Sequence, residues 1–153
     1  MKEEALKDYI TSKIPEAEFE EENKQFLSVK IPSEKLRKLA EQLWSDDETK
    51  FDFLFCLSGV DRVENLQVVY HLRSTEHTHE LVLKAVISNR NNPEIETVSD
   101  IWQTAEYHER EAYDFYGIKF QNHPDLRRIF LEDDWVGFPM RKDYVDEINI
   151  VEL

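Results

Sequence analysis

Two segments in the first third of the chain carry apolar side chains at the helical period. Residues 2–13 form the first segment, and Pro15 closes it. The second begins after Ser33, a typical N-cap residue. Its apolar positions fall on one helical face: Leu36, Leu39, Ala40, Leu43 and Trp44. We therefore predict two amphipathic helices, each with one face packed against other elements.

The residues between and after these helices have the patterns of β-strands. Residues 17–19 and 27–31 alternate apolar and polar side chains, which predicts a hairpin that turns near residues 22–24. Three longer strand-like runs follow at 51–57, 66–73 and 80–88. Short polar connections join them, which suits neighbouring antiparallel strands better than helical crossovers. The sequence therefore predicts an antiparallel meander, followed by a loop over residues 89–96.

The last predicted helix begins near Thr97 and ends at Gly117, a residue type favoured just after a helix. It is apolar on more than one side, so we expect it to have two neighbours. After Gly117 the periodicity stops, although large apolar side chains continue. We therefore predict an α/β domain of the α+β type over residues 1–117 and an extended C-terminal interaction tail over residues 118–153. The domain should hold a mixed, mostly antiparallel sheet with about three helices packed on it.

Length, charge and composition narrow the classes of protein to consider. The 153 residues suit one domain, and the net charge of −14 disfavours binding to nucleic acid or to anionic lipid. No run of 18 apolar residues occurs, and residues 1–15 hold no secretory signal, so we expect a cytoplasmic chain without direct membrane insertion. The single cysteine, Cys56, cannot hold an iron–sulfur cluster, and its apolar neighbours predict a buried position.

Histidine patterns offer two candidate metal sites, and neither is supported. His108 and Glu109 begin like the zinc-binding motif HExxH, but Ala112 stands where the second histidine is required. His77 and His79 lie in a polar turn with no third ligand close in sequence, which favours a solvated loop. The three glycines are isolated, so a glycine-rich phosphate loop is absent from the sequence. We therefore predict no catalytic, cofactor-binding or metal-binding residues.

Charged and aromatic residues between positions 108 and 144 favour structural and interface roles instead. Glu109, Arg110 and Glu111 are predicted to form structural ion pairs on the last helix. The block is rich in aromatic and arginine side chains with nearly balanced charge, which is typical of a surface that becomes buried against a partner. The predicted partner-interface residues are His123, Arg127, Arg128, Trp135, Phe138, Arg141 and Lys142.

The same block carries a long motif. Glu109-Arg110-Glu111 is followed by YDFYGI at 113–118, HPDLRRI at 123–129 and GFPMRKDY at 137–144. In this order the residues closely resemble the C subunit of NADH:quinone oxidoreductase, the 30 kDa subunit family of respiratory complex I. Family members commonly place Pro after the Lys-Asp-aromatic triplet, whereas Val145 follows here. The resemblance therefore ends at Tyr144.

The resemblance implies a hydrophilic, non-catalytic structural and assembly subunit in the peripheral arm of a proton-translocating NADH:quinone oxidoreductase. It implies no cofactor in this chain, with FMN, iron–sulfur clusters, NADH and quinone bound by other subunits. It also implies packing against the large quinone-site subunit, the D subunit, and against other peripheral-arm subunits. The complex would hold the chain on the cytoplasmic side of the cell membrane.

Other interpretations stay open at this point. The equivalent subunit of a membrane-bound nickel–iron hydrogenase or of a ferredoxin-dependent quinone reductase would fit the same motif. A metal-dependent hydrolase would use His108 and Glu109 together with His77 and His79. An acidic adaptor protein would need none of these residues.

Overall fold

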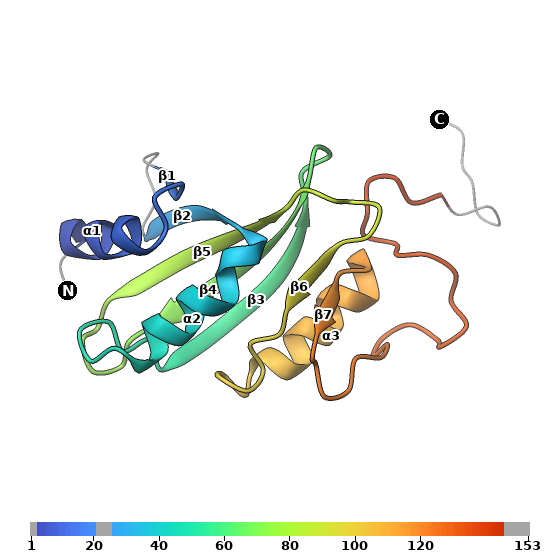
Figure 1. The fold of residues 1–153 in the computed structure, drawn as a ribbon. Coiled ribbons are helices and arrows are strands. Elements are labelled where there is room, and N and C mark those ends of the chain that lie inside the picture. Colours follow the sequence, from blue (N-terminus) through green and yellow to red (C-terminus); the bar gives the residue numbers. More distant parts are fainter. Residues whose placement is uncertain (1–2, 21–25, 146–153) are drawn as a thin grey trace.

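The computed structural model describes residues 3–20 and 26–145. Within them a five-stranded sheet of order β1-β2-β5-β4-β3 forms the centre of the molecule (Figure 1). Its strands are β1 (Glu18–Glu20), β2 (Leu27–Pro32), β3 (Phe53–Asp61), β4 (Leu66–Arg73) and β5 (Glu80–Ile87). Strands β2 and β5 are parallel and the other neighbours antiparallel, so the predicted mixed, mostly antiparallel sheet is confirmed.

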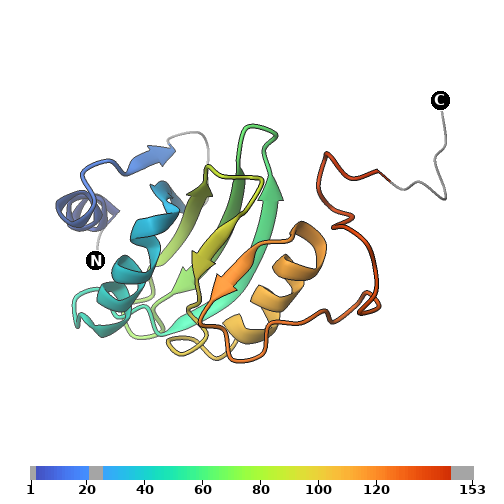
Figure 2. The ribbon, with the colours of Figure 1, turned by 45° about the vertical axis from the view of Figure 1, so that its right-hand side comes forward.

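The helices of the described residues lie together on one face of this sheet (Figure 2). They are α1 (Glu3–Lys13), the short 3-10 helix η1 (Ser33–Lys35), α2 (Leu36–Ser45) and α3 (Ala105–Tyr116). A small parallel pair, β6 (Glu94–Glu96) and β7 (Lys119–Gln121), lies beside α3 on the same face. The molecule therefore has two layers, one of strands and one mainly of helices.

The core lies between the sheet and the helical layer, where side chains of neighbouring strands point to the same face. Val29 on β2, Leu83 on β5 and Tyr70 on β4 point to the helical layer and are buried together with Leu6 and Ile10 of α1. Full burial of such a side chain stabilises the fold by about 1.5–3 kcal/mol. The predicted hairpin pairing of β1 with β2 and the predicted meander β3-β4-β5 are both confirmed, while the predicted turn at 22–24 lies outside the described residues.

Helix α3 is shorter than predicted because residues 97–104 bond to other elements. The indole N–H of Trp102 donates to the carbonyl of Phe51 at 2.9 Å, and the hydroxyl of Thr104 donates to the carbonyl of Leu54 at 2.6 Å. These bonds tie the segment to the start of β3 before α3 begins at Ala105. The predicted end is confirmed, since Gly117 follows the helix with φ of 74°.

Several local predictions about α2 and its neighbours are wrong. Ser33 does not cap α2 but opens a 3-10 turn without a side-chain cap bond. Trp44 is half exposed instead of joining the buried face, and Cys56 is only partly buried. The predicted loop over residues 89–96 contains β6, and β3 continues to Asp61 through part of a predicted connection. The last two differences follow from pairing with distant segments, since β6 pairs with β7 and the end of β3 pairs with β4.

The structure places core residues on both sides of the predicted boundary at Gly117. Ile118 and Phe120 are buried in the common core, and Phe120 lies on β7, opposite Ile95 of β6. The division into residues 1–117 and 118–153 stays a prediction, which unfolding of a chain truncated at Gly117 would test.

Candidate partner interface

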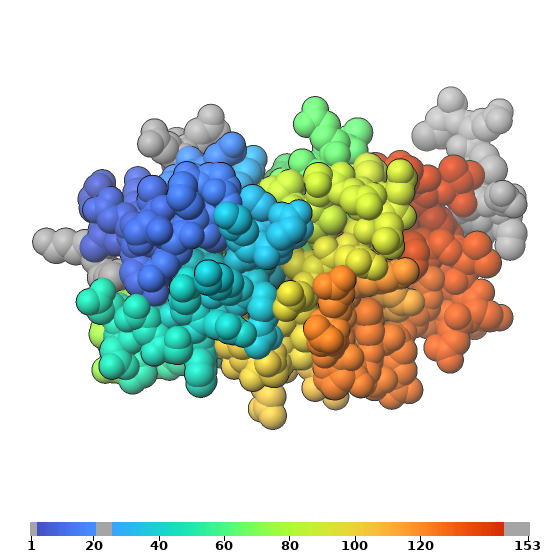
Figure 3. Space-filling view, in the orientation of Figure 1, coloured from blue at the N-terminus to red at the C-terminus, as the bar shows by residue number. Residues whose placement is uncertain are grey.

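The chain after β7 runs along the outer side of α3, away from the five-stranded sheet (Figures 1 and 2). Up to Val145, the limit of the described tail, it forms no further helix or strand. In the space-filling view it makes up one end of the molecule (Figure 3). Two clusters of charged residues fix its course.

Asp114, in the last turn of α3, is the centre of the first cluster. Its Oδ2 accepts hydrogen bonds from three consecutive backbone N–H groups, those of Ile129 (3.3 Å), Phe130 (2.8 Å) and Leu131 (3.2 Å). Its Oδ1 accepts from the guanidinium of Arg128 at 3.0 Å. Burial raises the pKa of Asp114, but these donors outweigh it and hold the pKa below its ordinary value. The buried carboxylate is therefore charged and paired at neutral pH.

Arg128 extends the first cluster across the tail. Its side chain is buried against Asp114, and its Nη2 donates to the carbonyls of Trp135 at 3.1 Å and Gly137 at 2.8 Å. The guanidinium also lies over the ring of Phe138, 4.9 Å from the centroid. One side chain thus joins the end of α3 to two points of the tail, and its donors are used within the chain.

Asp61, at the end of β3, is the centre of the second cluster. Its carboxylate accepts two hydrogen bonds from Arg90, at 2.7 and 2.9 Å, and one from the backbone N–H of Lys142 at 2.8 Å. The bond from Arg90 is the main reason that the pKa of Asp61 lies well below its ordinary value. Arg141 donates to the carbonyl of Arg90 at 2.9 Å and pairs with Asp143 at 2.9 Å. This cluster fastens the far end of the tail.

Aromatic packing supports the two clusters. Phe130 stacks on Phe115 of α3 with ring centroids 5.6 Å apart, and the N–H of Met140 donates to the carbonyl of Phe115 at 3.0 Å. The ring of Phe138 lies so close to Gly117 that a Cβ there would come within 2.6 Å of it. The tail therefore follows a defined path over α3.

The tail loop, defined as residues 129–140 between the two clusters, turns apolar side chains outward. Phe130 is 63% exposed, Trp135 40%, Val136 88% and Met140 55%. The acidic run 132–134 is exposed as well, and it has no ion-pair partner within 4 Å among residues 3–20 and 26–145. This surface combines an apolar tip with unbalanced negative charge.

Three of the seven residues predicted to contact a partner are exposed. Arg127 is paired with the exposed Asp125, and the side chains of Trp135 and Lys142 face outward. We keep a direct partner contact as a prediction for these three.

The other four predicted interface residues bond or pack within the chain: His123, Arg128, Phe138 and Arg141. The ring of His123 donates from Nε2 to the carbonyl of Glu106 at 3.0 Å and accepts the N–H of Asp125 at Nδ1, also at 3.0 Å. These four residues give the tail its path, and a partner contact stays a prediction for them as well.

Glu109 has contacts other than the predicted ion pair. Its carboxylate is fully buried in α3 and accepts hydrogen bonds from the hydroxyl of Thr97 at 2.6 Å and the N–H of Val98 at 3.2 Å. Burial raises its pKa to about 7, since these two neutral donors compensate only part of the lost hydration. Glu109 therefore holds the segment that precedes α3.

Arg110 and Glu111 also differ from the ion-pair prediction. The guanidinium of Arg110 donates to the carbonyls of Arg127 and Arg128, both at 3.3 Å, and Glu111 is exposed. In the described part of the chain no ion pair within 4 Å includes Glu109, Arg110 or Glu111. Arg110 thus anchors the start of the tail through backbone carbonyls.

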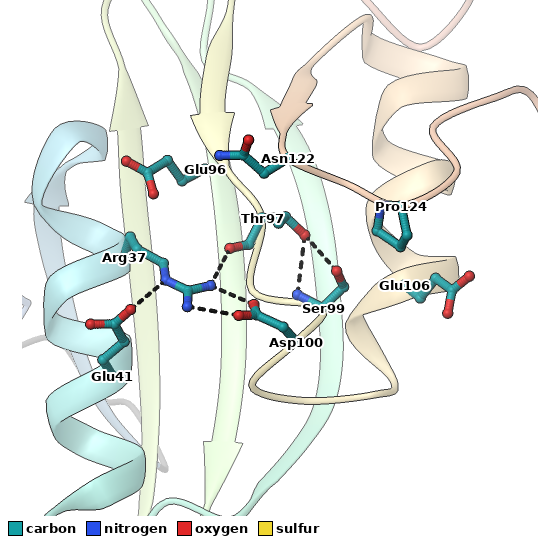
Figure 4. A pocket seen from close by; sticks show the side chains of 9 residues that line it. All are labelled: Arg37, Glu41, Glu96, Thr97, Ser99, Asp100, Glu106, Asn122 and Pro124. Carbon is teal, nitrogen blue, oxygen red and sulfur yellow. Dashed lines mark hydrogen bonds and ion pairs between the residues drawn. The ribbon is translucent and has the colours of Figure 1, made fainter.

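A polar hollow of about 530 Å³ lies between α2 and the segment before α3 (Figure 4). Arg37 of α2 crosses it and donates to Asp100 at 2.8 Å, to the carbonyl of Thr97 at 2.9 Å and to Glu41 at 2.8 Å. The arginine is neutralised by these contacts, and the other charged lining residues are acidic: Glu41, Glu96, Asp100 and Glu106. The arrangement joins α2 to the segment at 97–100 and shows no nucleophile paired with a base.

The histidines of the two candidate metal motifs bind backbone groups. His77 and His79 each donate from Nε2 to a carbonyl at 2.7 Å, those of Asp47 and Thr49. His108 accepts the N–H of Leu57 at its Nδ1, at 3.0 Å. Within residues 3–20 and 26–145, no three His, Cys, Asp or Glu side chains are grouped to hold a metal ion. None of the helices described there has the length and apolar character needed to cross a bilayer.

Sequence reasoning missed Asp114, Asp61 and Arg90, the residues on which the tail path depends. For Asp114 the sequence contains one feature that could have indicated its role. A carboxylate in the last turn of a helix is disfavoured by the helix dipole by about 0.3–1 kcal/mol, which favours a partner for it elsewhere in the chain. The sequence contains no such feature for Asp61 and Arg90, because they come from separate segments that only the fold brings together.

Comparison with known proteins places these features in a family. A family model described as "Respiratory-chain NADH dehydrogenase, 30 Kd subunit" matches residues 29–148, which includes the tail loop and both clusters. The C/D subunit of NADH-quinone oxidoreductase from Phocaeicola vulgatus is 49% identical over 82% of this chain, which spans only 24% of that relative. The C subunit of the same enzyme from Roseiflexus castenholzii is 42% identical over 76% of this chain and 68% of its own length.

Two solved structures share the fold. A trypsin-resistant fragment of Nqo5 is 27% identical and has a TM-score of 0.70, covering 82% of this chain and all of the fragment. A chain of a membrane-bound sulfane sulfur reductase, an archaeal respiratory membrane complex, is 26% identical with a TM-score of 0.78, over 97% of this chain and 88% of its own. The chain belongs to the family of the 30 kDa subunit of respiratory-chain NADH dehydrogenase.

Proposed function

We propose that this chain is a non-catalytic structural and assembly subunit in the peripheral arm of a proton-translocating NADH:quinone oxidoreductase. The observation that carries the proposal is the tail, which is fastened to the domain at both ends yet keeps large apolar side chains exposed. Such a surface on a small domain fits coverage by another protein. Its role is to hold neighbouring subunits in register on the cytoplasmic side of the membrane, with the redox cofactors on those subunits.

The D subunit, the large quinone-site subunit, is the proposed partner of the tail. The relative in Phocaeicola vulgatus carries both letters, C and D, in its name, and this chain matches 24% of its length. Parts joined in one polypeptide are held near each other, which favours contact between them. This supports the D subunit over other peripheral-arm subunits as the neighbour of the tail.

A related respiratory machine is the second candidate, because a chain of the sulfane sulfur reductase has the same fold. Its identity of 26% is well below the 41–50% of relatives named NADH-quinone oxidoreductase. The relatives named NADH-quinone oxidoreductase therefore favour the NADH-driven enzyme over the sulfane sulfur reductase. A hydrolase fits poorly, since His108 accepts a backbone N–H and Glu109 points to Thr97.

Co-expression of the full chain with the D subunit of the same organism tests the proposal. We expect a stable complex on affinity purification, and we expect a chain ending at Asp125, which keeps β7, to lose it. A chain with Trp44→Ala on α2 is the control and should bind as the unaltered chain does, because this half-exposed tryptophan lies away from the tail. Equal capture of the shortened chain would contradict the proposed tail contact.

Activity provides a second readout. In membranes of a strain that lacks this subunit, the full chain should restore NADH:quinone oxidoreduction, and the chain ending at Asp125 should not. Restoration by the shortened chain would show that assembly does not need the tail.

A further inference from the structure

We infer that the tail loop is a preformed docking element: its tip, Trp135 and Val136, enters an apolar pocket rimmed by Lys or Arg on the partner, and Asp114 and Arg128 set its shape. This rests on the proposed function and adds which residues dock, what they meet and what holds them ready. Four observations lead to it, concerning the anchors, the tip, the charge and the choice of partner.

The anchors leave the tail loop little freedom before a partner arrives. At its start Asp114 accepts three consecutive backbone N–H groups, and at its end the N–H of Lys142 bonds to Asp61. Arg128 ties the middle by donating to the carbonyls of Trp135 and Gly137. A loop that is already ordered loses less conformational entropy on binding, so more of its contact energy appears as affinity.

The tip has the composition of a binding anchor. Trp135 is 40% exposed and Val136 88% exposed, although the backbone beneath them is held by Arg128. A large aromatic side chain on a fixed backbone is the usual centre of an interface, where it enters an apolar pocket. Val136 and the open part of Trp135 therefore leave apolar surface that the domain does not cover.

The charge around the tip indicates which side chains should line the rim of that pocket. Glu132, Asp133 and Asp134 precede Trp135, and within the described chain they have no ion-pair partner within 4 Å. The two neighbouring arginines do not balance them, because Arg128 is paired with Asp114 and Arg127 with Asp125. A complementary surface therefore carries Lys or Arg around an apolar centre.

A partner subunit fits this tip better than a second copy of the chain. The net charge of −14 makes a like-charged copy a poor match for an acidic tip. The two clusters also hold the tail loop on the outer side of α3, so it cannot turn back onto the sheet (Figure 2).

The first measurement is the Kd of the full chain for the D subunit, with single substitutions that leave the core intact. Trp135→Ala should weaken binding by about tenfold or more, as expected for a central aromatic anchor. Trp44→Ala removes an equally large, half-exposed side chain elsewhere and should leave the Kd unchanged. Equal Kd values for the unaltered chain and Trp135→Ala would overturn the assignment of the tip.

The second measurement separates positioning from general stability. Arg128→Lys keeps the charge opposite Asp114 but cannot reach both carbonyls, so hydrogen exchange at Phe130 and Leu131 should speed up and the Kd should rise. If Arg128 acts through the tip, Arg128→Lys should hardly change the Kd of a chain that already carries Trp135→Ala. If the two residues act independently, the fold-changes in Kd of the two single variants should multiply in the double variant. Fully independent effects would overturn the positioning role, and near- and far-ultraviolet circular dichroism checks that the domain is folded.

The third measurement tests the basic rim. Replacing residues 132–134 by Gln, Asn and Asn should raise the Kd and reduce its dependence on salt. Neutralising the exposed Glu3, Glu4 and Asp8 of α1 makes the same change in net charge and serves as the control. If the Kd depends on salt to the same extent in the two variants, the proposal of a basic rim is wrong.

The failures of the two proposals are distinguishable. If the unaltered chain does not bind the D subunit, the proposed function falls, and this inference with it. If it binds but tolerates Trp135→Ala, only this inference falls. If the free chain associates with itself and Trp135→Ala abolishes this association, the inference is also wrong, and the tip contacts a second copy of the chain.

Discussion

Two fully buried carboxylates in α3, Asp114 and Glu109, show how neighbours decide the state of a charge. Asp114 receives three N–H donors and a guanidinium, and its pKa lies below the ordinary value. Glu109 accepts hydrogen bonds from one hydroxyl and one N–H and has no ion pair within 4 Å among the described residues, and its pKa is raised to about 7. Burial penalises both charges, so the number and charge of the donors account for the difference.

Glu109 should make the stability of the domain depend on pH. Its pKa rises from 4.5 in the unfolded chain to about 7 in the fold, so its stabilisation is complete below pH 4.5 and is lost as the pH rises through 7. The loss amounts to roughly 3 kcal/mol. Glu109→Gln should remove this dependence in urea unfolding at pH 5 to 8. Glu111→Gln, at an exposed site of the same helix, is the control; matching profiles for all three chains would contradict the assignment.

Gly117 should be sensitive to any added side chain. Its φ of 74° disfavours other residues, and a Cβ would lie 2.6 Å from the ring of Phe138. Gly117→Ala should therefore lower the free energy of unfolding by roughly 2 kcal/mol. In a Phe138→Ala background only the backbone cost of about 1 kcal/mol should remain. Equal losses in the two backgrounds, measured by urea unfolding, would show that the ring contact does not matter.

At the scale of elements, local patterns predicted the strands and helices better than their partners. The apolar, β-branched runs in Leu66–Arg73 and Glu80–Ile87 identified two strands of the meander, and both strands are buried over most of their length. The parallel pairing of β2 with β5 escaped prediction, since Val29 and Leu83 meet only in the folded sheet. For the candidate interface, the sequence indicated that the residues of interest lie in the tail. It did not indicate that Arg128 and Arg141 point inward, because their partners Asp114 and Arg90 come from distant segments.

Strand β7 should decide where the chain can be shortened. A chain ending at Gly117 loses Ile118 and Phe120 from the core and leaves β6 unpaired, so we expect it to lose cooperative unfolding. A chain ending at Asp125 keeps these contacts and should unfold cooperatively in urea. A cooperative transition in the chain ending at Gly117 would instead support the boundary predicted from the sequence.

At the scale of the molecule, the layered domain and the tail differ in what holds them together. Apolar burial dominates between sheet and helices, whereas the tail is fastened mainly by buried charged groups such as Asp114 and Asp61. The tail can therefore keep its apolar side chains outward without losing its path. The tail and its exposed apolar side chains make up one end of the molecule (Figure 3).

Limited trypsin digestion should show this division. No Lys or Arg occurs between Lys119 in β7 and Arg127, whose side chain is 68% exposed, so the resistant core should end at Arg127. A trypsin-resistant fragment of the related Nqo5 supports the existence of such a core. Bound D subunit should slow the cut. Intact-mass spectrometry checks both expectations; a core ending at Lys119 would show that β7 is readily opened.

The position of Phe120 and Asp114 ahead of the tail loop in the sequence also sets an order of events during synthesis. Every element on which the loop rests, from β3 to β7, leaves the ribosome before Trp135 does. Domains form as units while the chain emerges, so the core can close before the apolar tip is available. The surface proposed here for docking therefore emerges after the part of the chain that forms the core.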